Sequence, residues 1–571
     1  MQQSTDSLLA GLDEQQRVAA EALIGPVCML AGAGTGKTRA ITHRIAYGVR
    51  TGAYAPNRVM ALTFTSRSAA ELRGRLRHLG AGGVAARTFH AAALSQLNYF
   101  WPHVVGGQTP RVLDGKARML GHVAEQLRLK LDTATLRDLA AEIEWRKVSG
   151  LSVDQYVTAS PKRSLPGRLT IDQVAALQLG YERLKDERKQ LDFEDVLLAM
   201  SGMIESEPSV AMQVREQYRF FVVDEFQDVS PLQYNLLSLW LGDRRDLCVV
   251  GDASQTIYSF AGARSDYLLD FPKRYEDATV VRLEQNYRST SAIVATANQL
   301  MRGRPGALSL HAAVSEPGPD PIIREFASDI AEARAVAQSI LELIESGTRP
   351  EEIAILFRVN VQSALLEAAL TEVGVSYQIR GSKRFFDLPE VKQAVMSLRA
   401  ASVSIIGEPL FKSVSDVLRS LGWSQTAPEA RGAVRDRWES LNAIMGLVDQ
   451  AVPGTTFRQF TDELMERQAG QHEPTVAAVT LASMHSAKGL EWDAVFLVGL
   501  AEGLVPISYA STFEQIDEER RLLYVGVTRA RKRLTLSWAS TGSQQRSPRE
   551  RSRFLSEIGI RNARVAGARG V

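Results

Sequence analysis

The stretch MLAGAGTGKTRAITHRI, residues 29–45, joins an apolar run to a glycine-rich turn and then to a helical pattern. Its AGAGTGKT segment has the spacing of a P-loop, with an alanine in the first small-residue position. Glycines let backbone N–H groups approach phosphate oxygens, and the start of the following helix favours an anion. The stretch therefore predicts a phosphate-binding strand, turn and helix formed by Ala31, Gly32, Ala33, Gly34, Thr35, Gly36, Lys37 and Thr38.

Two of these residues and a second motif indicate what happens to the phosphates. Lys37 would reach the β- and γ-phosphates, and Thr38 would bind Mg²⁺. The run FFVVDE ends in Asp224 and Glu225, the arrangement of a Walker B acidic pair. Asp224 would hold the Mg²⁺, and Glu225 would activate the attacking water. Alone, this pair could equally be two carboxylates on a surface turn, but beside a P-loop it predicts an NTPase.

Composition sets the broad class. The chain has 571 residues with 67 basic and 65 acidic side chains, a balance that does not by itself require a nucleic-acid partner. Its two cysteines, Cys28 and Cys248, lie in apolar runs, which excludes a disulfide framework or a cysteine-based zinc site. The sequence has no secretory core at its start and no run of about 18 apolar residues. We therefore expect a cytoplasmic protein with no membrane partner.

The apolar runs indicate the fold class. They are continuous rather than alternating, which is typical of parallel strands covered on both faces. Two stretches, 100–190 and 389–475, interrupt them with helical patterns. The sequence thus predicts an α/β protein with two parallel sheets, helices on both faces of each sheet, and a mainly helical insertion in each half. The expected strands are 26–30, 59–64, 220–225, 247–252 and 280–285, then 321–326, 352–357, 479–484, 494–500 and 533–539.

From about residue 10 to residue 558, the chain resembles the superfamily 1 helicases of the UvrD/Rep/PcrA type. The resemblance rests on ordered motifs: AGAGTGKT, ALTFTSRSAAELRGRL, TFHA, LDFEDVLL, VDEFQD, VVGDASQTIYSFAGA, LEQNYRST, ILFRVNVQS, RFFDLPEVK, TLASMHSAKGLEWDAVFLVGL and RRLLYVGVTRAR. A finer resemblance is to the second UvrD-type helicase group of actinobacteria. It is carried by GLDEQQR, YFW, EIEWRK and HSAKGLEWDAVFLVGLAEGLVPIS.

The resemblance implies two RecA-like P-loop NTPase lobes, 1A and 2A, with insertions 1B and 2B. The implied ranges are 1–99 and 191–283 for 1A, 100–190 for 1B, 284–388 and 476–558 for 2A, 389–475 for a shortened 2B, and 559–571 for a basic tail.

The resemblance also implies that ATP is hydrolysed with Mg²⁺ at the cleft between the lobes. Gln16 would read the adenine edge, while Arg39 and Tyr287 would enclose its ring. Gln255 would sense the γ-phosphate, and Glu491 would lie on the ribose or γ-phosphate side. Composition alone makes Arg288 and Arg529 ordinary surface residues, whereas the resemblance makes them paired arginine fingers.

The implied second substrate is DNA. The family moves 3′→5′ on single-stranded DNA and acts on 3′-tailed duplex, in DNA repair or replication. Phe64, Tyr258 and Phe260 would stack on bases, which tolerates any sequence because every base has a π face. Alone, each aromatic would more simply be core packing. The backbone or sugar contacts would come from Thr63, Thr88, His90, Arg358, Asn360 and His485. We expect a monomer or weak dimer, and the sequence names no repair-protein partner.

The chain departs from the family pattern in four places. Ser254 replaces a usual carboxylate, and Phe260-Ala261 replaces Trp-Arg. Insertion 2B is short, and no aromatic residue lies between Trp538 and Phe554, where relatives carry a strand-separating pin. These departures leave open a translocase that strips proteins but unwinds poorly. A non-hydrolysing ATP-dependent DNA-binding module is a further alternative, against which the intact Lys37 and acidic pair argue.

Overall fold

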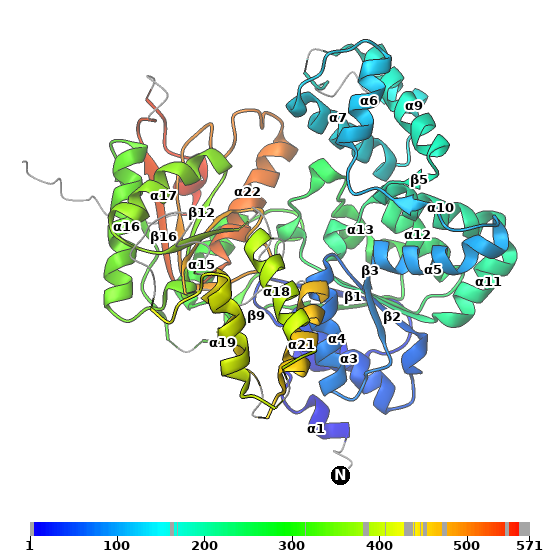
Figure 1. Cartoon of the computed structure of the whole chain (residues 1–571), viewed down its shortest axis with the longest axis horizontal. Coiled ribbons are helices and arrows are strands. Elements are labelled where there is room, and N and C mark those ends of the chain that lie inside the picture. The colour runs from blue at the N-terminus through cyan, green and yellow to red at the C-terminus, as the bar shows by residue number, and fades with distance from the viewer. Residues whose placement is uncertain are drawn as a thin grey trace, which may run out of the picture. The chain divides into compact units, whose positions relative to one another are not determined.

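The computed structural model describes residues 5–558 except 160–164, 168, 315, 381–387, 406, 427–437, 439, 443, 446, 449–450, 452–453, 471–476 and 543–547. The chain forms two compact units (Figure 1). Unit 1 is Met1–Glu284 with Arg304–Ser309, and unit 2 is Gln285–Gly303 with Leu310–Val571. Most of the pin segment, the basic tail and residues 384–387 of RFFDLPEVK lie outside the described residues.

Unit 1 is built on a six-stranded parallel sheet in the order β3-β2-β6-β7-β1-β8. Its strands alternate their side chains between two apolar cores. Met60, Phe221 and Val249 enter one core, and their neighbours Ala61, Val222 and Val250 enter the other. Burial on both faces explains why the strands read as continuous apolar runs. The strands are β1 (Val27–Ala31), β2 (Val59–Thr63), β3 (Ala85–Thr88), β6 (Phe220–Val223), β7 (Leu247–Gly251) and β8 (Thr279–Leu283).

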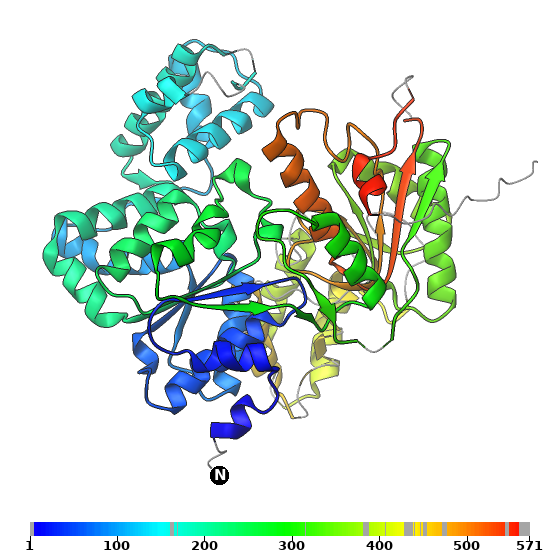
Figure 2. The same cartoon turned by 180° about the vertical axis from the view of Figure 1, so that it is seen from behind.

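Helices cover both faces of this sheet, as Figure 2 shows for the dark blue helices on one side and the teal helices on the other. The first face carries α2 (Glu14–Glu21), α3 (Lys37–Arg50) and α4 (Ser66–His78), preceded by α1 (Thr5–Leu9). The second face carries α5 (Phe89–Val104), α10 (Phe193–Ser206), α11 (Pro208–Gln217) and α12 (Pro231–Leu241). The short helices α13 (Asp266–Leu269) and α14 (Phe271–Arg274) follow β7.

The first insertion has a helical core of its own. Leu120, Ile143, Tyr156 and Val174 are buried together. Its helices are α6 (Ala117–Gln126), α7 (Thr133–Val148), α8 (Val153–Ala159) and α9 (Ile171–Glu187), and a two-residue ladder joins β4 (Arg111–Val112) to β5 (Gln190–Leu191). Helix α5 continues past residue 99, and its Phe100 is buried in the core of the sheet.

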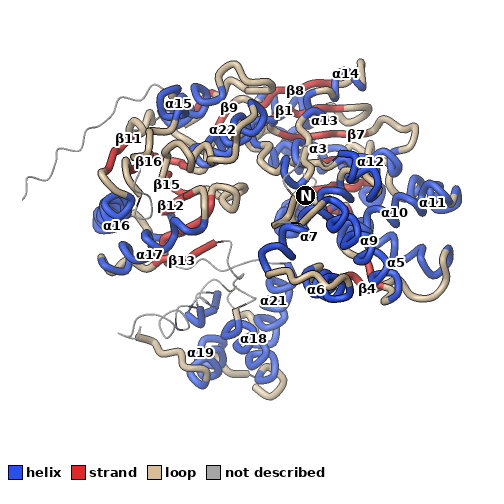
Figure 3. The backbone as a smooth tube through the Cα atoms, turned by 90° about the horizontal axis from the view of Figure 1, so that it is seen from above, coloured by secondary structure: helices blue, strands red, loops and turns tan. Residues whose placement is uncertain are grey.

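Unit 2 holds a second six-stranded parallel sheet in the order β11-β16-β15-β12-β14-β13. Figure 3 marks the strands in red and the helices in blue. The strands are β11 (Ile322–Phe326), β12 (Ile353–Phe357), β13 (Tyr377–Arg380), β14 (Val479–Ser483), β15 (Trp492–Leu497) and β16 (Ala530–Ala539). The helices are α15 (Ser291–Met301), α16 (Asp329–Glu345), α17 (Ser363–Glu372), α22 (Phe513–Val527) and α23 (Arg553–Glu557), and β9 (Gln285–Asn286) pairs with β10 (His311–Ala312).

The second insertion also has a separate apolar core, which includes Val391, Leu418, Leu441 and Phe460. Its helices include α18 (Pro389–Ala401), α19 (Leu410–Ser420) and α21 (Phe457–Gly470). The predicted fold class is confirmed, since every strand expected from the apolar runs is present with somewhat shifted ends. Among the described helices, none has the length and apolarity needed to cross a membrane.

Candidate nucleotide and DNA sites

The P-loop joins β1, which ends at Ala31, to α3, which begins at Lys37. Gly34 and Gly36 have φ angles of +72° and +76°, in the left-handed region that side chains with a Cβ disfavour. The hydroxyl of Thr35 donates to the carbonyl of Gly32 at 2.8 Å and closes the loop. A Cβ on Gly36 would lie 2.7 Å from Nε2 of Gln16, so glycine is required there for two independent reasons.

The predicted adenine residues of unit 1 are held against this loop. Gln16 is buried, closes a capping box with Asp13 at the start of α2, and donates from Nε2 to the carbonyl of Thr35 at 2.9 Å. Nη2 of Arg39 donates to the carbonyl of Gly11 at 2.6 Å. The segment preceding α2 is thus tied to the start of α3. Reading of adenine by Gln16 and Arg39 stays a prediction.

Lys37 and the acidic pair meet beyond the loop. Nζ of Lys37 lies 2.9 Å from Oε1 of Glu225. Glu225 has a φ of +53°, which is unusual for a residue with a side chain and is typical of strained functional positions. Its backbone N–H donates to Oδ1 of Asp224 at 2.9 Å. The carboxyl end of β6 therefore presents both carboxylates near Lys37.

The charges at this edge of the sheet support one another. Burial alone would lower the pKa of Lys37, but the carboxylates of Glu225, Asp224 and Asp252 outweigh burial and raise it. Burial raises the pKa of Asp252, while Lys37 and a hydrogen bond from Gln255 partly offset that effect. Lys37 therefore stays protonated, stabilised by the charges of three carboxylates, of which Glu225 is in direct contact.

Gln227 connects these groups and was not singled out by the sequence. Its Nε2 donates to Oε2 of Glu225 at 2.5 Å, and its Oε1 accepts the backbone N–H of Asp252 at 3.0 Å. Asp252 in turn accepts from Nε2 of Gln255 at 2.8 Å. The signal was present in the motifs, because Gln227 stands in VDEFQD and Asp252 in VVGDASQ.

Unit 2 holds the two predicted arginine fingers close to Glu491. Nε of Arg288 lies 2.5 Å from Oε2 of Glu491, and its Nη1 donates to the carbonyl of Thr528 at 3.2 Å. Burial works to raise the pKa of Glu491, but the guanidinium groups of Arg288 and Arg531 outweigh it and lower the pKa. Tyr287, next to Arg288 in the chain, is 44% exposed.

Arg529 lies just past the end of a helix rather than on it, although the helical pattern from DEERR onward predicts that the helix carries it. Helix α22 ends at Val527, and Arg529 follows it in the turn into β16. The turn buries its side chain, because Nε donates to the carbonyl of Val525 at 2.9 Å and Nη1 to that of Leu490 at 3.1 Å. Its guanidinium is thereby fixed by backbone acceptors.

The predicted stacking aromatics of unit 1 lie together. Phe64, just past β2, and Tyr258 stack with ring centroids 5.5 Å apart and an interplanar angle of 14°. Phe260 packs edge-on to Tyr258 at 6.1 Å. Phe64 is 44% exposed and Phe260 66% exposed, so both rings offer faces to solvent rather than filling the core. Aromatic rings placed in this way suit unstacked bases.

The polar residues of unit 1 that were predicted to contact DNA differ in burial and in hydrogen bonding. Thr63 is buried, and its hydroxyl has no hydrogen-bond partner among the described residues. The hydroxyl of Thr88 accepts the N–H of Ala91 and caps α5. His90 packs edge-on to Phe193 at 5.9 Å, and burial together with Lys116 lowers its pKa to about 4. His90 is therefore neutral at neutral pH and offers no charge to a phosphate.

The polar residues of unit 2 surround one ion pair. Arg358 holds Glu519 through Nε, at 3.1 and 3.0 Å from the two carboxylate oxygens, and through Nη2 at 2.8 Å. Burial, with Arg358 and Lys488, lowers the pKa of His485 to about 4. Asn360 begins a short 3-10 turn, Asn360–Gln362. Arg358 is thus already oriented by a carboxylate.

Comparison with known proteins identifies the family. The UvrD/REP helicase N-terminal domain matches residues 12–276, and the UvrD-like helicase C-terminal domain matches residues 281–403 and 430–541. This chain belongs to the UvrD/REP helicase family. It is 49% identical to ATP-dependent DNA helicase UvrD2 of Mycobacterium tuberculosis, over 97% of this chain and 82% of the relative. It is 31% identical to DNA helicase II of Escherichia coli, over 94% and 85%, and 28% identical to ATP-dependent DNA helicase PcrA of Bacillus subtilis, over 97% and 86%.

As a UvrD/REP helicase, the chain is an enzyme, and its donors fit the expected metal. Thr38, next to Lys37 in the chain, supplies a hydroxyl, and Asp224, whose charge acts on Lys37, supplies a carboxylate. Mg²⁺ prefers oxygen ligands and is usually held by one or two carboxylates, waters and substrate phosphates. The oxygen donors at the P-loop and at the end of β6 are therefore suited to Mg²⁺, with no need for histidine or cysteine.

One departure of this UvrD/REP helicase has a local explanation. Ser254 is buried, and its backbone N–H donates to Oδ1 of Asp252 at 2.9 Å. A carboxylate in place of Ser254 would add a negative charge beside Asp252, whose pKa burial already raises. The serine keeps the turn and lowers the negative charge around Gln255.

Proposed function

We propose that this helicase hydrolyses ATP with Mg²⁺ and uses the energy to move 3′→5′ along single-stranded DNA. The observation that carries the proposal is the contact of 2.9 Å between Nζ of Lys37 and Oε1 of Glu225. A P-loop lysine binds the β- and γ-phosphates of a nucleotide, and the second acidic residue orients the attacking water. The side chains of Lys37 and Glu225, which would carry these two roles, are in contact with each other.

The pairing suggests how the site responds to its substrate. The triphosphate would become the partner of Lys37, and this exchange would release Oε1 of Glu225. Glu225 would stay oriented by Gln227, which donates to its other carboxylate oxygen. The freed oxygen could then accept a proton from water, and the strained backbone of Glu225 fixes its direction. Bound Mg²⁺, held by Thr38 and Asp224, would neutralise charge on the phosphate oxygens.

The two arginines of unit 2 would stabilise the transferring phosphoryl group. Arg288 and Arg529 are held by hydrogen bonds to backbone carbonyls and, for Arg288, by Glu491. Preorganised cations act mainly on charge that develops in the transition state. Tyr287, with Gln16 and Arg39, would bind the adenine.

The DNA track would combine the exposed rings of Phe64 and Phe260, and the partly buried ring of Tyr258, with the predicted polar residues. Stacking without hydrogen-bond readout gives binding that tolerates any sequence, as a motor requires. Gln255 and Tyr258 lie three residues apart, so a segment that contacts the acidic cluster continues into the aromatic platform. Activity in repair or replication, on 3′-tailed duplex, is part of this proposal.

A second candidate is a translocase that strips proteins from DNA but separates strands poorly. The sequence favours it through the absence of an aromatic residue between Trp538 and Phe554, and through the short 2B insertion. Measuring translocation and unwinding separately distinguishes the two, since robust duplex separation by the purified chain would exclude this candidate.

The proposal is tested by ATP hydrolysis with and without single-stranded DNA, followed by strand displacement on 3′- and 5′-tailed duplexes. We expect DNA to stimulate hydrolysis, and displacement or streptavidin removal to require the 3′ tail. Hydrolysis that ignores DNA would favour a binding module, and preference for the 5′ tail would contradict the polarity.

A further inference from the structure

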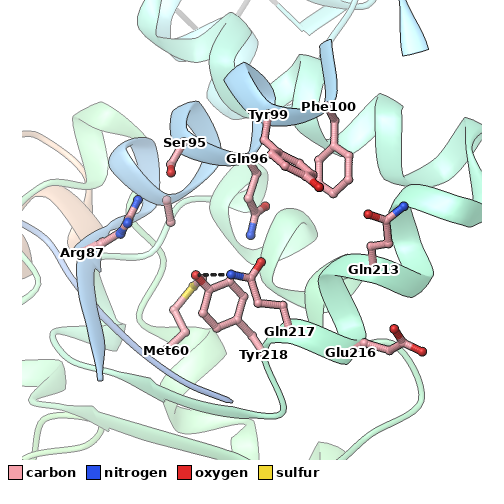
Figure 4. Close-up of a pocket in the computed structure, with 11 residues that line it drawn as sticks. Met60, Arg87, Ser95, Gln96, Tyr99, Phe100, Gln213, Glu216, Gln217 and Tyr218 are labelled. Carbon is pink, nitrogen blue, oxygen red and sulfur yellow. Dashed lines mark hydrogen bonds between the residues drawn. The ribbon is translucent and has the colours of Figure 1, made fainter. Parts of the chain in front are cut away.

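A pocket of about 660 Å³ opens between α5 and α11 of unit 1 (Figure 4). Met60 lies near the amino end of β2, and Tyr218 lies just before β6. The P-loop and the acidic pair follow the carboxyl ends of strands in the same parallel sheet. The pocket therefore lies away from the nucleotide residues, and its volume falls within the range of about 300–1,000 Å³ that ligand sites occupy.

Gln96 of α5 has a buried donor that finds no partner in the part of the chain that the structure describes. The residue is 7% exposed, and its Oε1 accepts the indole N–H of Trp240 at 2.7 Å. Because an indole N–H can only donate, this bond fixes which end of the amide is oxygen. Nε2 is consequently turned the other way, where none of the described residues accepts a hydrogen bond from it. Figure 4 shows this nitrogen directed into the space above Tyr218.

Tyr218 supplies a second donor on the opposite wall. Its ring is buried, and its phenolic oxygen accepts from Nε2 of Gln217 at 3.2 Å. Since that oxygen accepts this bond, its own O–H remains available to donate. A buried donor that makes no hydrogen bond is unfavourable, so Gln96 favours a ligand that carries acceptors, and the O–H of Tyr218 can donate to the same ligand.

Arg87 of β3 adds a positive charge, and it forms no ion pair among the described residues. Burial lowers the pKa of nearby Arg73, and the guanidinium groups of Arg87 and Arg77 lower it further. The sheet edge beside the pocket is thus cationic. The one carboxylate that lines the pocket, Glu216, is exposed and points away from Gln96 in Figure 4.

The pocket continues into a second one of about 370 Å³. Both are lined by Tyr99, Phe100 and Gln213, and the second adds Val104 and Val210. Tyr99 is 61% exposed and packs edge-on to Phe100 at 4.9 Å. The two pockets together form a groove with donors and a cation at one end, while the other end combines aromatic and aliphatic side chains with His103, Glu207 and Ser209. Two connected compartments suit an extended ligand better than a compact one.

We propose that this groove binds a peptide segment of a partner protein, with an acidic side chain between Arg87 and Gln96 and an aromatic or aliphatic residue beyond Tyr99. A carboxylate matches the planar guanidinium and accepts from both neutral donors. The P-loop follows the carboxyl end of its strand, whereas the pocket lies near the amino ends of β2 and β6. A partner bound in the groove could therefore dock on unit 1 without covering the predicted nucleotide residues.

The test uses the full chain and fluorescein-labelled pentapeptide amides, each with a central Asp or Glu between an aromatic and an aliphatic residue. Fluorescence anisotropy measures binding, and the same peptides with Asn or Gln serve as matched probes. We expect the acidic peptides to bind at least about tenfold more tightly than the amides, since hydrogen bonds to charged groups are the stronger ones. Equal binding of acidic and amide peptides would overturn the proposal.

Variants locate the site. Gln96→Glu keeps an acceptor for Trp240 but replaces the free donor with an oxygen, and Arg87→Gln removes the cation. Each should weaken binding of the acidic peptides about tenfold. Tyr218→Phe should weaken it a few-fold. Arg50→Gln, at the end of α3 on the other face of the sheet, should leave it unchanged. Thermal unfolding and ATP turnover establish that each variant is folded, and unchanged affinity in folded Arg87→Gln and Gln96→Glu would overturn the proposal.

Two small anions, used as competitors, distinguish binding of a peptide from binding of phosphate or of a small carboxylic acid. Inorganic phosphate should not displace the peptide at millimolar concentration, and displacement by it would contradict carboxylate recognition. The small acid 3-phenylpropionate should compete only weakly. If it binds while every peptide fails, the groove takes a small carboxylic acid and the peptide assignment is wrong.

Discussion

Replacement of Glu225 by Gln separates two roles that this carboxylate holds. In the structure Glu225 is the partner of Lys37, at 2.9 Å, and in the proposed function it is also the base that activates the attacking water. Glutamine has the same size and retains an acceptor, but it has no charge and cannot take a proton. We therefore predict that Glu225→Gln lowers turnover and at the same time tightens nucleotide binding.

The expected loss of turnover and the expected gain in nucleotide affinity have different physical causes. Loss of a general base costs about 10²–10⁴ in turnover. The gain in affinity comes from Lys37, which no longer has to leave a carboxylate before it binds phosphate. A hydrogen bond to a charged group contributes about 1.5–3 kcal/mol. The two side chains are 14% and 24% exposed, so solvent screening favours the lower end of that range, which corresponds to about tenfold in affinity.

The assay pairs steady-state ATP hydrolysis in the presence of single-stranded DNA with equilibrium binding of a fluorescent ATP analogue. Glu71→Gln, which removes an exposed carboxylate on α4 from its pair with Arg75, is the matched control and should change neither quantity. Weaker nucleotide binding in Glu225→Gln would show that the carboxylate holds the lysine in a productive position rather than competing for it. Unchanged turnover would refute the assignment of Glu225 as the base.

Four further predictions follow from the same contacts. Lys37→Ala should abolish ATP hydrolysis while leaving some DNA binding, and unchanged turnover would contradict the P-loop assignment. Arg529→Ala should lower hydrolysis more than nucleotide affinity, because its charge acts on the transition state; equal losses in both would argue against a finger. Gly36→Ala should destabilise unit 1 by about 1–2 kcal/mol through its left-handed φ, measured by denaturant unfolding, and should weaken nucleotide binding through the clash with Gln16. His90 has a pKa of about 4 in the folded protein against 6.5 in the unfolded chain. Its contribution to stability is therefore present above pH 6.5 and is lost towards pH 4, by at most about 1.4 kcal/mol per pH unit. His90→Gln should flatten that part of the curve of unfolding free energy against pH, and an unchanged curve would show that the histidine is not buried as the structure has it.

The sequence was sufficient where burial or backbone conformation dictates residue type. Strands β1, β2, β6 and β7 are buried on both faces, so their apolar runs located them. The glycine spacing predicted a tight loop after β1, and Gly34 and Gly36 do have positive φ there. The edge strands β3 and β13 were not predicted, because AART and YQIR contain polar and charged residues that an edge position tolerates.

The hydrogen-bond partners of individual side chains could not be predicted from the sequence, for a different reason. The bond from Gln227 to Glu225 depends on the left-handed backbone of Glu225, which no local pattern requires. The position of Arg529 depended on where α22 ends, and its V-G-V-T sequence contains no residue that must stop a helix. Such features are decided by tertiary contacts, which override weak local preferences.

The hydrogen bonds around Gln227 give a physical route from the nucleotide residues to the aromatic platform. Nucleotide binding at Lys37 would release one oxygen of Glu225, whose other oxygen accepts from Gln227. Gln227 also holds the backbone N–H of Asp252, and Asp252 holds the side chain of Gln255, three residues before Tyr258. A shift of Glu225 therefore cannot leave this turn unaffected unless a buried hydrogen bond is lost, at a cost of about 1–3 kcal/mol. Coupling of hydrolysis to DNA should accordingly depend on Gln227, although its hydrogen bonds among the described residues go to Glu225, Asp228 and Asp252 rather than to Lys37.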